Sequence, residues 1–331
     1  MTKRSFDVAR RGALLALPAA LLLALAPVTQ AQAKWPEKPV KIILPFGAGG
    51  VADVTARIMA DKLSKKFGER VVIENQPGPG GINAARSVVT APPDGYTMGF
   101  VTNGTAISVS AFKHLPFDPV KQFSMVSGLG QFNLLLAVDA RSPYKTLGDF
   151  IKAAKASPGK LNIGTIAVGG TQNLGAELFK SLAGINVVIV PFKRSPDVVV
   201  GLLRNDVQML VEFPPAIKGQ VAAGKLRVLA STGVKPEDSL KGVPTAEQAG
   251  VKGFVVKSWN GVFAPKGTPE EVIDTMSKAM HEVLAEPDVI EQYAKLGVTA
   301  NPTTPAELMD TLKDDIKKWA VVIEKAGIPK K

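Results

Sequence analysis

The 331-residue chain has no cysteine and only two histidines, His114 and His281. Without cysteine it cannot form a disulfide, a thiolate zinc site or a thiol nucleophile, and it cannot carry a lipid on an N-terminal cysteine. Two histidines are too few for a multi-histidine metal site. The chemistry of this protein must therefore come from oxygen, nitrogen and backbone groups, which favours binding over catalysis, and no cofactor or metal is expected.

Charged residues are also scarce, at 21% of the chain, although the formal net charge is +11. The 46% of hydrophobic residues are enough for a sizeable core in one large or two medium domains. A basic chain can bind nucleic acid, an anionic membrane or an anionic ligand. Here the basic residues are scattered beside acidic ones, as in residues 313–318, so they indicate solvated helix faces and no nucleic-acid partner.

The first 33 residues have the composition of a secretory signal peptide. A basic segment that includes Arg10 and Arg11 precedes the uncharged run Gly12–Ala26, and Ala31-Gln32-Ala33 is a small-x-small cleavage site. Because the run is shorter than the roughly 20 residues that cross a bilayer, a membrane anchor is the less favoured interpretation. We expect cleavage after Ala33, and the arginine pair leaves both the Sec and the twin-arginine export routes open.

After this segment, short β-rich runs alternate with helical patterns. Strands are predicted at 42–44, 71–73, 187–190, 207–211 and 226–230. Between the first two runs, apolar residues recur at i, i+3 and i+4 and give one apolar helix face. The alternation predicts an α/β fold with parallel, helix-covered sheets.

Two segments, 48–59 and 168–179, match in residue type position by position. Each follows a predicted strand and continues as a Gly-Gly turn and a helix start, with Asp53 in the first where Asn173 stands in the second. Glycine lets a ligand approach the backbone, and a helix start leaves N–H groups without intrahelical partners, so each segment can bind an anion. One copy would only indicate a tight strand–helix turn. Two copies predict a ligand at the carboxyl ends of the strands of two facing sheets.

Several enzyme signatures are incomplete. Residues 47–50 lack the third glycine of a dinucleotide fingerprint and the Lys-Ser/Thr of a P-loop. Residues 142–145 match S-x-x-K, but Pro143 predicts a turn before a helix at 147–156, and the companion motifs are missing. Both histidines are expected to be structural.

Two further helices are predicted to begin at capping boxes. These are Thr268-Pro269-Glu270-Glu271, before the helix that carries His281, and Thr304-Pro305-Ala306-Glu307, before a last helix that runs towards Ala326. The apolar spacing of the last helix predicts that it packs on the core as a cover.

A series of short motifs runs through the chain after residue 33. They are Lys34-Trp35-Pro36, Pro45-Phe46-Gly47-Ala48-Gly49-Gly50-Val51-Ala52-Asp53, Glu74-Asn75-Gln76-Pro77-Gly78-Pro79-Gly80-Gly81, Asp94-Gly95-Tyr96-Thr97, Leu115-Pro116-Phe117-Asp118-Pro119, Ala223-Gly224-Lys225-Leu226-Arg227, Val243-Pro244-Thr245 and Ser258-Trp259-Asn260-Gly261. In order and spacing the sequence resembles the tripartite tricarboxylate transporter receptors, or Bug family. Each motif alone is weak, and together they span the exported chain.

The resemblance implies a periplasmic solute-binding protein with a type II periplasmic-binding-protein fold, made of two doubly wound α/β domains with a ligand cleft between them. Residues 34–133 plus 257–331 would form domain 1, and residues 134–256 domain 2. The ligand would be a small carboxylate, held by backbone N–H groups and hydroxyls. The protein would act as a monomer and deliver the ligand to the membrane permease subunits of a tripartite transporter.

Carried over residue by residue, the resemblance assigns the ligand to three loops. The first supplies Phe46, Gly47, Gly49, Gly50 and Asp53; the second Val168, Gly169, Gly170 and Thr171; the third Thr102, Asn103 and Thr105.

The chain departs from the family pattern at three positions of the second half. Arg194 stands where members commonly have a small residue, and it is a candidate to bind a second carboxylate as a bidentate pair. The alternatives are that Arg194 points to water or pairs with Glu212, which stands where members often have aspartate. Asn173 stands where many members have histidine.

Three functions are compatible with these residues. The favoured one is reversible capture of a carboxylate by hinge closure, for delivery to the permease. An extracytoplasmic sensor that presents the ligand to a signalling partner would use the same closed form. A hydrolase or isomerase with Asp53 and Glu212 as acid and base is less supported, since the sequence shows no nucleophile beside a base.

Overall fold

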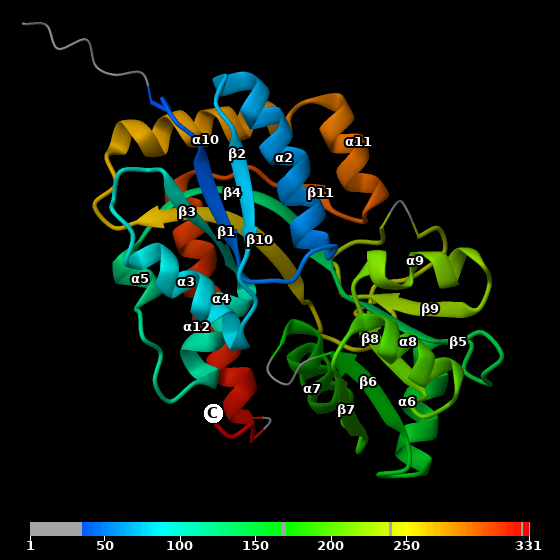
Figure 1. Ribbon diagram of the computed structural model, residues 1–331. Coiled ribbons are helices and arrows are strands. Elements are labelled where there is room, and N and C mark those ends of the chain that lie inside the picture. The colour runs from blue at the N-terminus through cyan, green and yellow to red at the C-terminus, as the bar shows by residue number, and fades with distance from the viewer. Residues whose placement is uncertain (1–34, 167–169, 238–239, 326, 331) are drawn as a thin grey trace, which may run out of the picture. The chain divides into compact units, whose positions relative to one another are not determined.

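A computed structural model describes residues 35–166, 170–237, 240–325 and 327–330 (Figure 1). The predicted signal peptide and its cleavage site after Ala33 lie outside these residues, as do Val168 and Gly169. None of the helices in the described ranges combines the length and apolar character that a membrane crossing requires.

Residues 38–331 form one compact unit that contains two sheets. The first sheet has the order β11-β4-β10-β3-β1-β2, with β1 (Val40–Leu44), β2 (Val71–Asn75), β3 (Thr97–Thr102), β4 (Phe123–Asn133), β10 (Lys257–Pro265) and β11 (Thr299–Ala300). The second has the order β7-β6-β8-β5-β9, with β5 (Leu135–Asp139), β6 (Asn162–Ile166), β7 (Val188–Phe192), β8 (Met209–Glu212) and β9 (Leu226–Ser231).

Helices connect and cover these strands. Around the first sheet are α2 (Val51–Phe67), the short 3-10 turn η2 (Pro79–Gly81), α3 (Ile82–Val89), α4 (Asn103–Ala111), α5 (Pro119–Gln122), α10 (Glu270–Leu284), α11 (Pro287–Lys295) and α12 (Pro305–Lys325). Around the second are α6 (Leu147–Ala156), α7 (Thr171–Ala183), α8 (Ser195–Leu203) and α9 (Pro214–Ala222).

The two sheets are mixed, so the predicted parallel pairing holds for only part of each sheet. β1 pairs in parallel with β2 and β3, and β6 with β7 and β8. By contrast, β10 is antiparallel to β3 and β4, and β5 to β8 and β9. The antiparallel strands β4, β5 and β10 lie where the chain passes from one sheet to the other. They are therefore not second strands of βαβ units, whose crossovers impose the parallel direction.

The order of the parallel strands fixes where the helices lie. The connection β1–α2–β2 moves one way across the first sheet, and β2–α3–β3 moves back past β1. Because such crossovers are right-handed, α2 and α3 cover opposite faces, as Figure 1 shows. The same argument puts α7 and α8 on opposite faces of the second sheet. Each sheet therefore reverses its winding between two parallel strands, β1 and β3 or β6 and β8, where ligands of open α/β folds bind.

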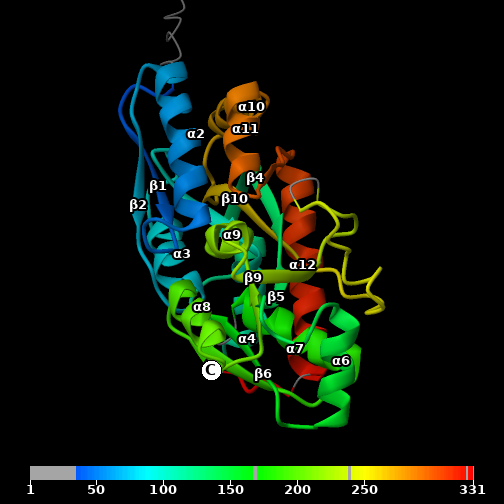
Figure 2. The same cartoon turned by 90° about the vertical axis from the view of Figure 1, so that its right-hand side faces the viewer.

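Helix α2 packs with α10 and α11 on one side of the first sheet (Figure 2). The Tyr293 hydroxyl of α11 donates to the Thr55 carbonyl of α2 at 3.0 Å. Lys62 of α2 pairs with Glu286 and Asp288 at 2.6 and 2.7 Å. The helix that begins at the first Gly-Gly turn is therefore anchored along its length.

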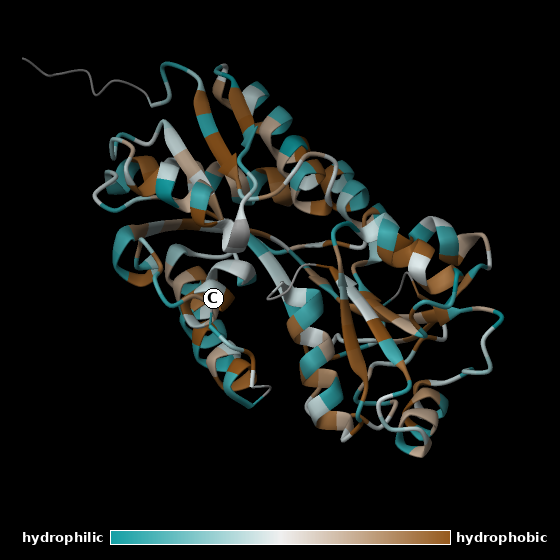
Figure 3. Cartoon of the chain, turned by 60° about the horizontal axis from the view of Figure 1, so that its bottom comes forward, coloured by the Kyte–Doolittle hydropathy of each residue, from teal (hydrophilic) through white to brown (hydrophobic). Residues whose placement is uncertain are grey.

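One hydrophobic core cluster contains residues of both sheets. It joins Phe263 of β10 and Trp319 of α12 to Leu136 of β5, Phe179 of α7 and Phe254. The strands in Figure 3 are mostly hydrophobic, while the helices carry both kinds of residue, as amphipathic covers do. The prediction that the last helix is a packed cover is confirmed: Trp319 is fully buried, a contribution of about 1.5–3 kcal/mol for a large apolar side chain.

Only one of the two predicted capping boxes forms. At α12 the Glu307 N–H donates to Thr304 Oγ1 at 3.2 Å, and the Thr304 N–H donates to Glu307 Oε2 at 2.8 Å. The box at residue 268 is wrong, since Pro269 is the N-cap of α10 and no side chain caps that helix. Thr268 stands one residue too early, and its hydroxyl donates to the Pro265 carbonyl at 2.8 Å instead.

Candidate functional site

The two matching segments begin their helices with the same backbone geometry. Gly50 is the N-cap of α2 with φ −79° and ψ 170°, and Gly170 is the N-cap of α7 with φ −79° and ψ 167°. Each glycine carbonyl accepts the first helical hydrogen bond at 2.9 Å, from Val54 and Leu174 respectively. A glycine N-cap has no side chain to satisfy the other N–H groups of the first turn, so these stay open to a ligand.

The first loop, residues 46–50, is exposed and faces open space. Phe46 is 40% exposed, and Gly49 has φ +85°, a left-handed conformation that favours glycine. At Gly47, Gly49 and Gly50, no heavy atom of the described chain other than those of sequence neighbours lies within 4 Å of where a Cβ would be. A ligand can thus reach the backbone of this loop directly.

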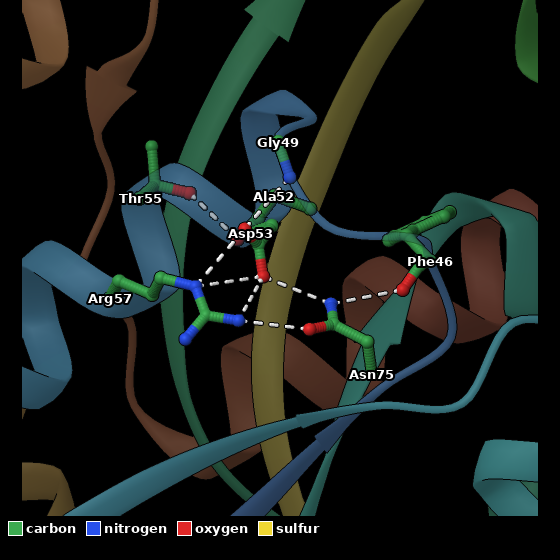
Figure 4. Close-up of polar contacts among 7 residues, drawn as sticks. All are labelled: Phe46, Gly49, Ala52, Asp53, Thr55, Arg57 and Asn75. Carbon is green, nitrogen blue, oxygen red and sulfur yellow. Dashed lines mark hydrogen bonds and ion pairs between the residues drawn. The ribbon is translucent and has the colours of Figure 1, made fainter. Parts of the chain in front are cut away.

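Asp53 supports that loop from beneath (Figure 4). Its carboxylate is 3% exposed and accepts from the Gly49 N–H at 2.9 Å and from Arg57 Nε and Nη2 at 3.1 and 2.9 Å. Burial alone would raise the pKa of Asp53, but the hydrogen bonds from Arg57, Gly49 and Asn75 outweigh it and hold this pKa below its ordinary value. The carboxylate predicted on the ligand wall is therefore engaged within the protein.

Asn75, at the end of β2, completes the support of the first loop. Its Nδ2 donates to Asp53 Oδ1 at 2.9 Å and to the Phe46 carbonyl at 3.0 Å, and its Oδ1 accepts from Arg57 at 2.9 Å. Asn75 lies in one of the family motifs but was not predicted to belong to the site. Because Asn75 ends β2, which pairs in parallel with β1, its place at the same sheet edge as the first loop could have indicated it.

The third loop begins α4 and contains a buried amide. Thr102 is the N-cap, and its N–H donates to Thr105 Oγ1 at 3.2 Å. Asn103 Oδ1 accepts from Thr171 Oγ1 at 2.9 Å and from Ser258 Oγ at 3.2 Å. Asn103 Nδ2 is buried and donates to no protein atom of the described ranges. The structure thus brings Asn103 of the third loop together with Thr171 of the second. Ser258 of β10 also contacts Asn103, although it was not predicted to belong to the site.

At the second loop, the structure describes Gly170 and Thr171 and places a buried carboxyl beside them. Glu212, 1% exposed, accepts from Gln172 Nε2 at 2.8 Å, Ser195 Oγ at 2.6 Å and the Phe213 N–H at 2.8 Å. Burial raises the pKa of Glu212, against the effect of these three hydrogen bonds. Asn173 donates to Thr165 Oγ1 at 3.3 Å.

Arg194 does not pair with Glu212, so that alternative is wrong. Its guanidinium forms a bidentate pair with Asp197, one turn along the chain, at 3.1 and 2.8 Å. The side chain is 75% exposed. Asp197 at the start of α8 supplies the carboxylate that Arg194 binds, whereas the oxygens of Glu212 accept from neutral donors.

The described part of the chain holds no group of three or more histidine, aspartate or glutamate side chains that could hold a metal ion. What the geometry offers is backbone N–H groups, hydroxyls and one buried amide. The N–H groups of this set can donate hydrogen bonds to an acceptor such as a carboxylate.

Comparisons with known proteins identify the family of this chain. The profile described as "Tripartite tricarboxylate transporter family receptor" matches residues 55–328. A Cupriavidus necator protein, described as the UPF0065 protein in the gbd 5' region, is 34% identical over 334 residues, which is 100% of this chain and 99% of its own length.

Two solved structures are also similar. Rhodopseudomonas palustris Rpa4515 with adipate has a TM-score of 0.82 and 31% identity, over 88% of this chain and 98% of that one. MatC from the same organism with bound malate has a TM-score of 0.77 and 28% identity, over 87% and 100%. The chain thus has the α/β fold of the periplasmic binding proteins in this group, and it belongs to the tripartite tricarboxylate transporter receptor family.

Proposed function

We propose that this protein is a periplasmic receptor that captures a small organic acid by hinge closure and delivers it to a tripartite transporter permease. The observation that carries the proposal is the pair of glycine-capped helix starts at Gly50 and Gly170, with Asn103 hydrogen-bonded to Thr171. Open N–H groups at a helix start attract a carboxylate through both hydrogen bonds and the helix dipole. Adipate and malate, bound in the two similar structures, support a carboxylate as the ligand.

The three loops take different roles in this proposal. The backbone N–H groups of Gly47, Gly50 and Thr171 offer donors to the ligand, and Phe46 offers an apolar wall. The Thr171 hydroxyl already donates to Asn103. Gly49 makes the bend, because its own N–H is already bonded to Asp53. Asp53, Thr102 and Thr105 support their loops, and Val168 and Gly169 keep the ligand-binding roles that the family resemblance implies. Arg194, already paired with Asp197, has no ligand contact in this proposal.

Hinge closure requires two domains, and the sheets support the bounds 34–133 plus 257–331 and 134–256. The chain leaves the first sheet at Leu134 and returns after residues 232–256. Thr232 joins these passages: its N–H donates to the Leu134 carbonyl at 2.9 Å, and its carbonyl accepts from the Val256 N–H at 3.2 Å. A hinge that follows this hydrogen-bonded crossing would let the two sheets rotate as rigid bodies.

A ligand screen of the refolded chain from Lys34 tests the proposal. Refolding removes ligand that survives purification, and mono-, di- and tricarboxylates, aromatic acids and amino acids are then compared by thermal shift and calorimetry. At a thousand times its dissociation constant, a ligand adds about 4 kcal/mol of stability, enough to raise Tm by several degrees. A chemically coherent set of acids should give such shifts; folded, emptied protein that responds to no acid would contradict carboxylate capture.

Asn103→Asp sharpens the test. The substitution keeps an oxygen that accepts from Thr171 and Ser258, but it replaces the buried Nδ2 donor by a second, negative oxygen. We expect at least a hundredfold loss of affinity for the acid that gives the largest shift. An unchanged dissociation constant would remove Asn103 from the ligand contacts.

A further inference from the structure

Glu212 is a buried carboxyl for which capture of a carboxylate has no evident use. An ionised carboxylate placed near an anionic ligand would repel it, and burying such a group is costly unless hydrogen bonds compensate. The three compensating donors, from Gln172, Ser195 and Phe213, are all neutral. The burial of Glu212 among neutral donors therefore suggests a structural role for this carboxyl group.

The three donors stand at the starts of three different helices. Gln172 is in the first turn of α7, Ser195 is the first residue of α8, and Phe213 is the N-cap of α9. These helices follow β6, β7 and β8, which are adjacent in the order β7-β6-β8. One carboxyl group therefore ties together the three loops at the carboxyl edge of the second sheet, where its winding reverses.

Two of these loops also contact residues of the first sheet and its helices. Beside Gln172, the Thr171 hydroxyl donates to Asn103 at 2.9 Å. The ring of Phe213 packs edge-on against Phe132 of β4, with ring centroids 4.7 Å apart. Thr171 is thus next to Gln172, which donates to Glu212, and Phe213 itself donates to Glu212.

We propose that Glu212 is the positioning residue of the second wall of the site: it fixes the starts of α7, α8 and α9, so that Thr171 and the α7 N–H groups meet the ligand in a preformed arrangement. This inference rests on the proposed function. Glu212 acts through Gln172 and Phe213 and does not itself touch the ligand. A site held in advance by its supporting hydrogen bonds loses less free energy to ordering when a ligand binds.

A pair of substitutions separates positioning from charge. Glu212→Gln keeps an oxygen for Gln172 and the Phe213 N–H, and its amide can donate to the Ser195 hydroxyl, whereas Glu212→Ala removes every bond. Calorimetry with the acid selected by the screen should show at least a tenfold loss of affinity for Glu212→Ala and a change within about threefold for Glu212→Gln.

Asp149→Ala is the matched control. Asp149 caps α6 by accepting from the Thr146 N–H at 2.8 Å. Strand β5 starts opposite Glu212 and runs antiparallel to β8, so it ends at the opposite edge of the sheet. Helix α6 follows β5 and therefore begins at that opposite edge, away from the site. This variant should lower Tm and leave the dissociation constant unchanged.

Hydrogen exchange of ligand-free protein gives a readout that does not depend on the ligand. Glu212→Ala should speed exchange in the segments 171–178 and 195–202, and Glu212→Gln should not. If no acid binds wild-type protein, the proposed function fails, while the exchange data still decide whether Glu212 holds the loops.

Three results would overturn the positioning role: wild-type affinity in folded Glu212→Ala, a loss in Glu212→Gln as large as in the alanine variant, or unchanged exchange. Should Glu212→Ala not fold, Gln172→Ala removes only the α7 contact. That variant should then show the loss of affinity and the faster exchange of 171–178, and normal values would equally reject the proposal.

Discussion

The two glycine-capped helix starts have the same backbone and different supports. At α2 the carboxylate lies on the helix itself, where Asp53 is held by Arg57 one turn later, and Asn75 of β2 adds to it. At α7 it comes from a neighbouring strand, where Glu212 accepts from neutral donors. Glycine fixes the N-cap geometry locally, so it can be repeated, whereas the polar support depends on what the surrounding fold supplies. The two segments therefore share their backbone conformation and their open N–H groups, and they do not share the side chains that support them.

The supports also differ in their dependence on pH. The pKa of Asp53 is lowered, so its contribution to stability is present above the ordinary value of 3.8 and is lost as the pH falls through the lowered pKa. The pKa of Glu212 is raised, so its contribution is complete below the ordinary value of 4.5 and is lost as the pH rises through the raised pKa. Acid therefore weakens the support of the first wall, whereas a rise in pH weakens that of the second.

The largest effect is expected from filling the first glycine turn. Gly50→Leu suits the backbone, since φ −79° is open to any residue, and its side chain would enter the space that we assign to the ligand. Calorimetry should show at least a hundredfold loss of affinity with Tm near that of wild type. Gly219→Leu on α9, where a Cβ also meets nothing within 4 Å, is the control and should bind normally. Equal affinity of the two variants would separate the first turn from the ligand.

Asp53→Asn gives the first segment the residue type that Asn173 provides at the matching position of the second. Removing hydrogen bonds from Arg57 to a buried charge should cost about 1–3 kcal/mol at pH 7, measured by urea unfolding. The difference from wild type should shrink as the pH falls below 3.8 and through the lowered pKa of Asp53, where the folded protein takes up the proton. Asp61→Asn, which loses only an exposed pair with Lys65 on the same helix, should show neither effect. A pH-independent difference would mean that the charge of Asp53 is not what supports the loop.

Thr304→Ala probes a helix start that a side chain does cap. The loss of the α12 capping box should cost about 1 kcal/mol of stability. Ligand affinity should stay at the wild-type value, because this helix start is closed to ligands. A change in the dissociation constant would show that α12 contributes to the site.

Arg194→Ala is expected to have the smallest effect. Its guanidinium is already paired with Asp197 and largely exposed. The ratio of affinities for a dicarboxylate and the matching monocarboxylate should therefore stay within about threefold of wild type. A selective tenfold loss for the dicarboxylate would instead assign Arg194 to the second carboxylate.

Features fixed by neighbouring residues could be predicted from the sequence, including the matched Gly-Gly turns and the α12 capping box. Partners from distant segments could not. Asn75 and Ser258 join the site, and Gln172 meets Glu212, only because the strand order brings β2, β10 and β8 beside the loops. The antiparallel direction of β4, β5 and β10 could not be predicted either. The periodicity of a sequence indicates which face of a strand is buried, but it does not indicate the direction of the strand in the sheet.

The core cluster that runs through both sheets makes the two halves thermodynamically inseparable. Unfolding either half would expose apolar surface on the other, since Phe179 and Trp319 belong to one cluster. The protein should therefore melt cooperatively in one transition, with equal calorimetric and van't Hoff enthalpies. A substitution or a ligand in either half then reports on the whole molecule through a single Tm.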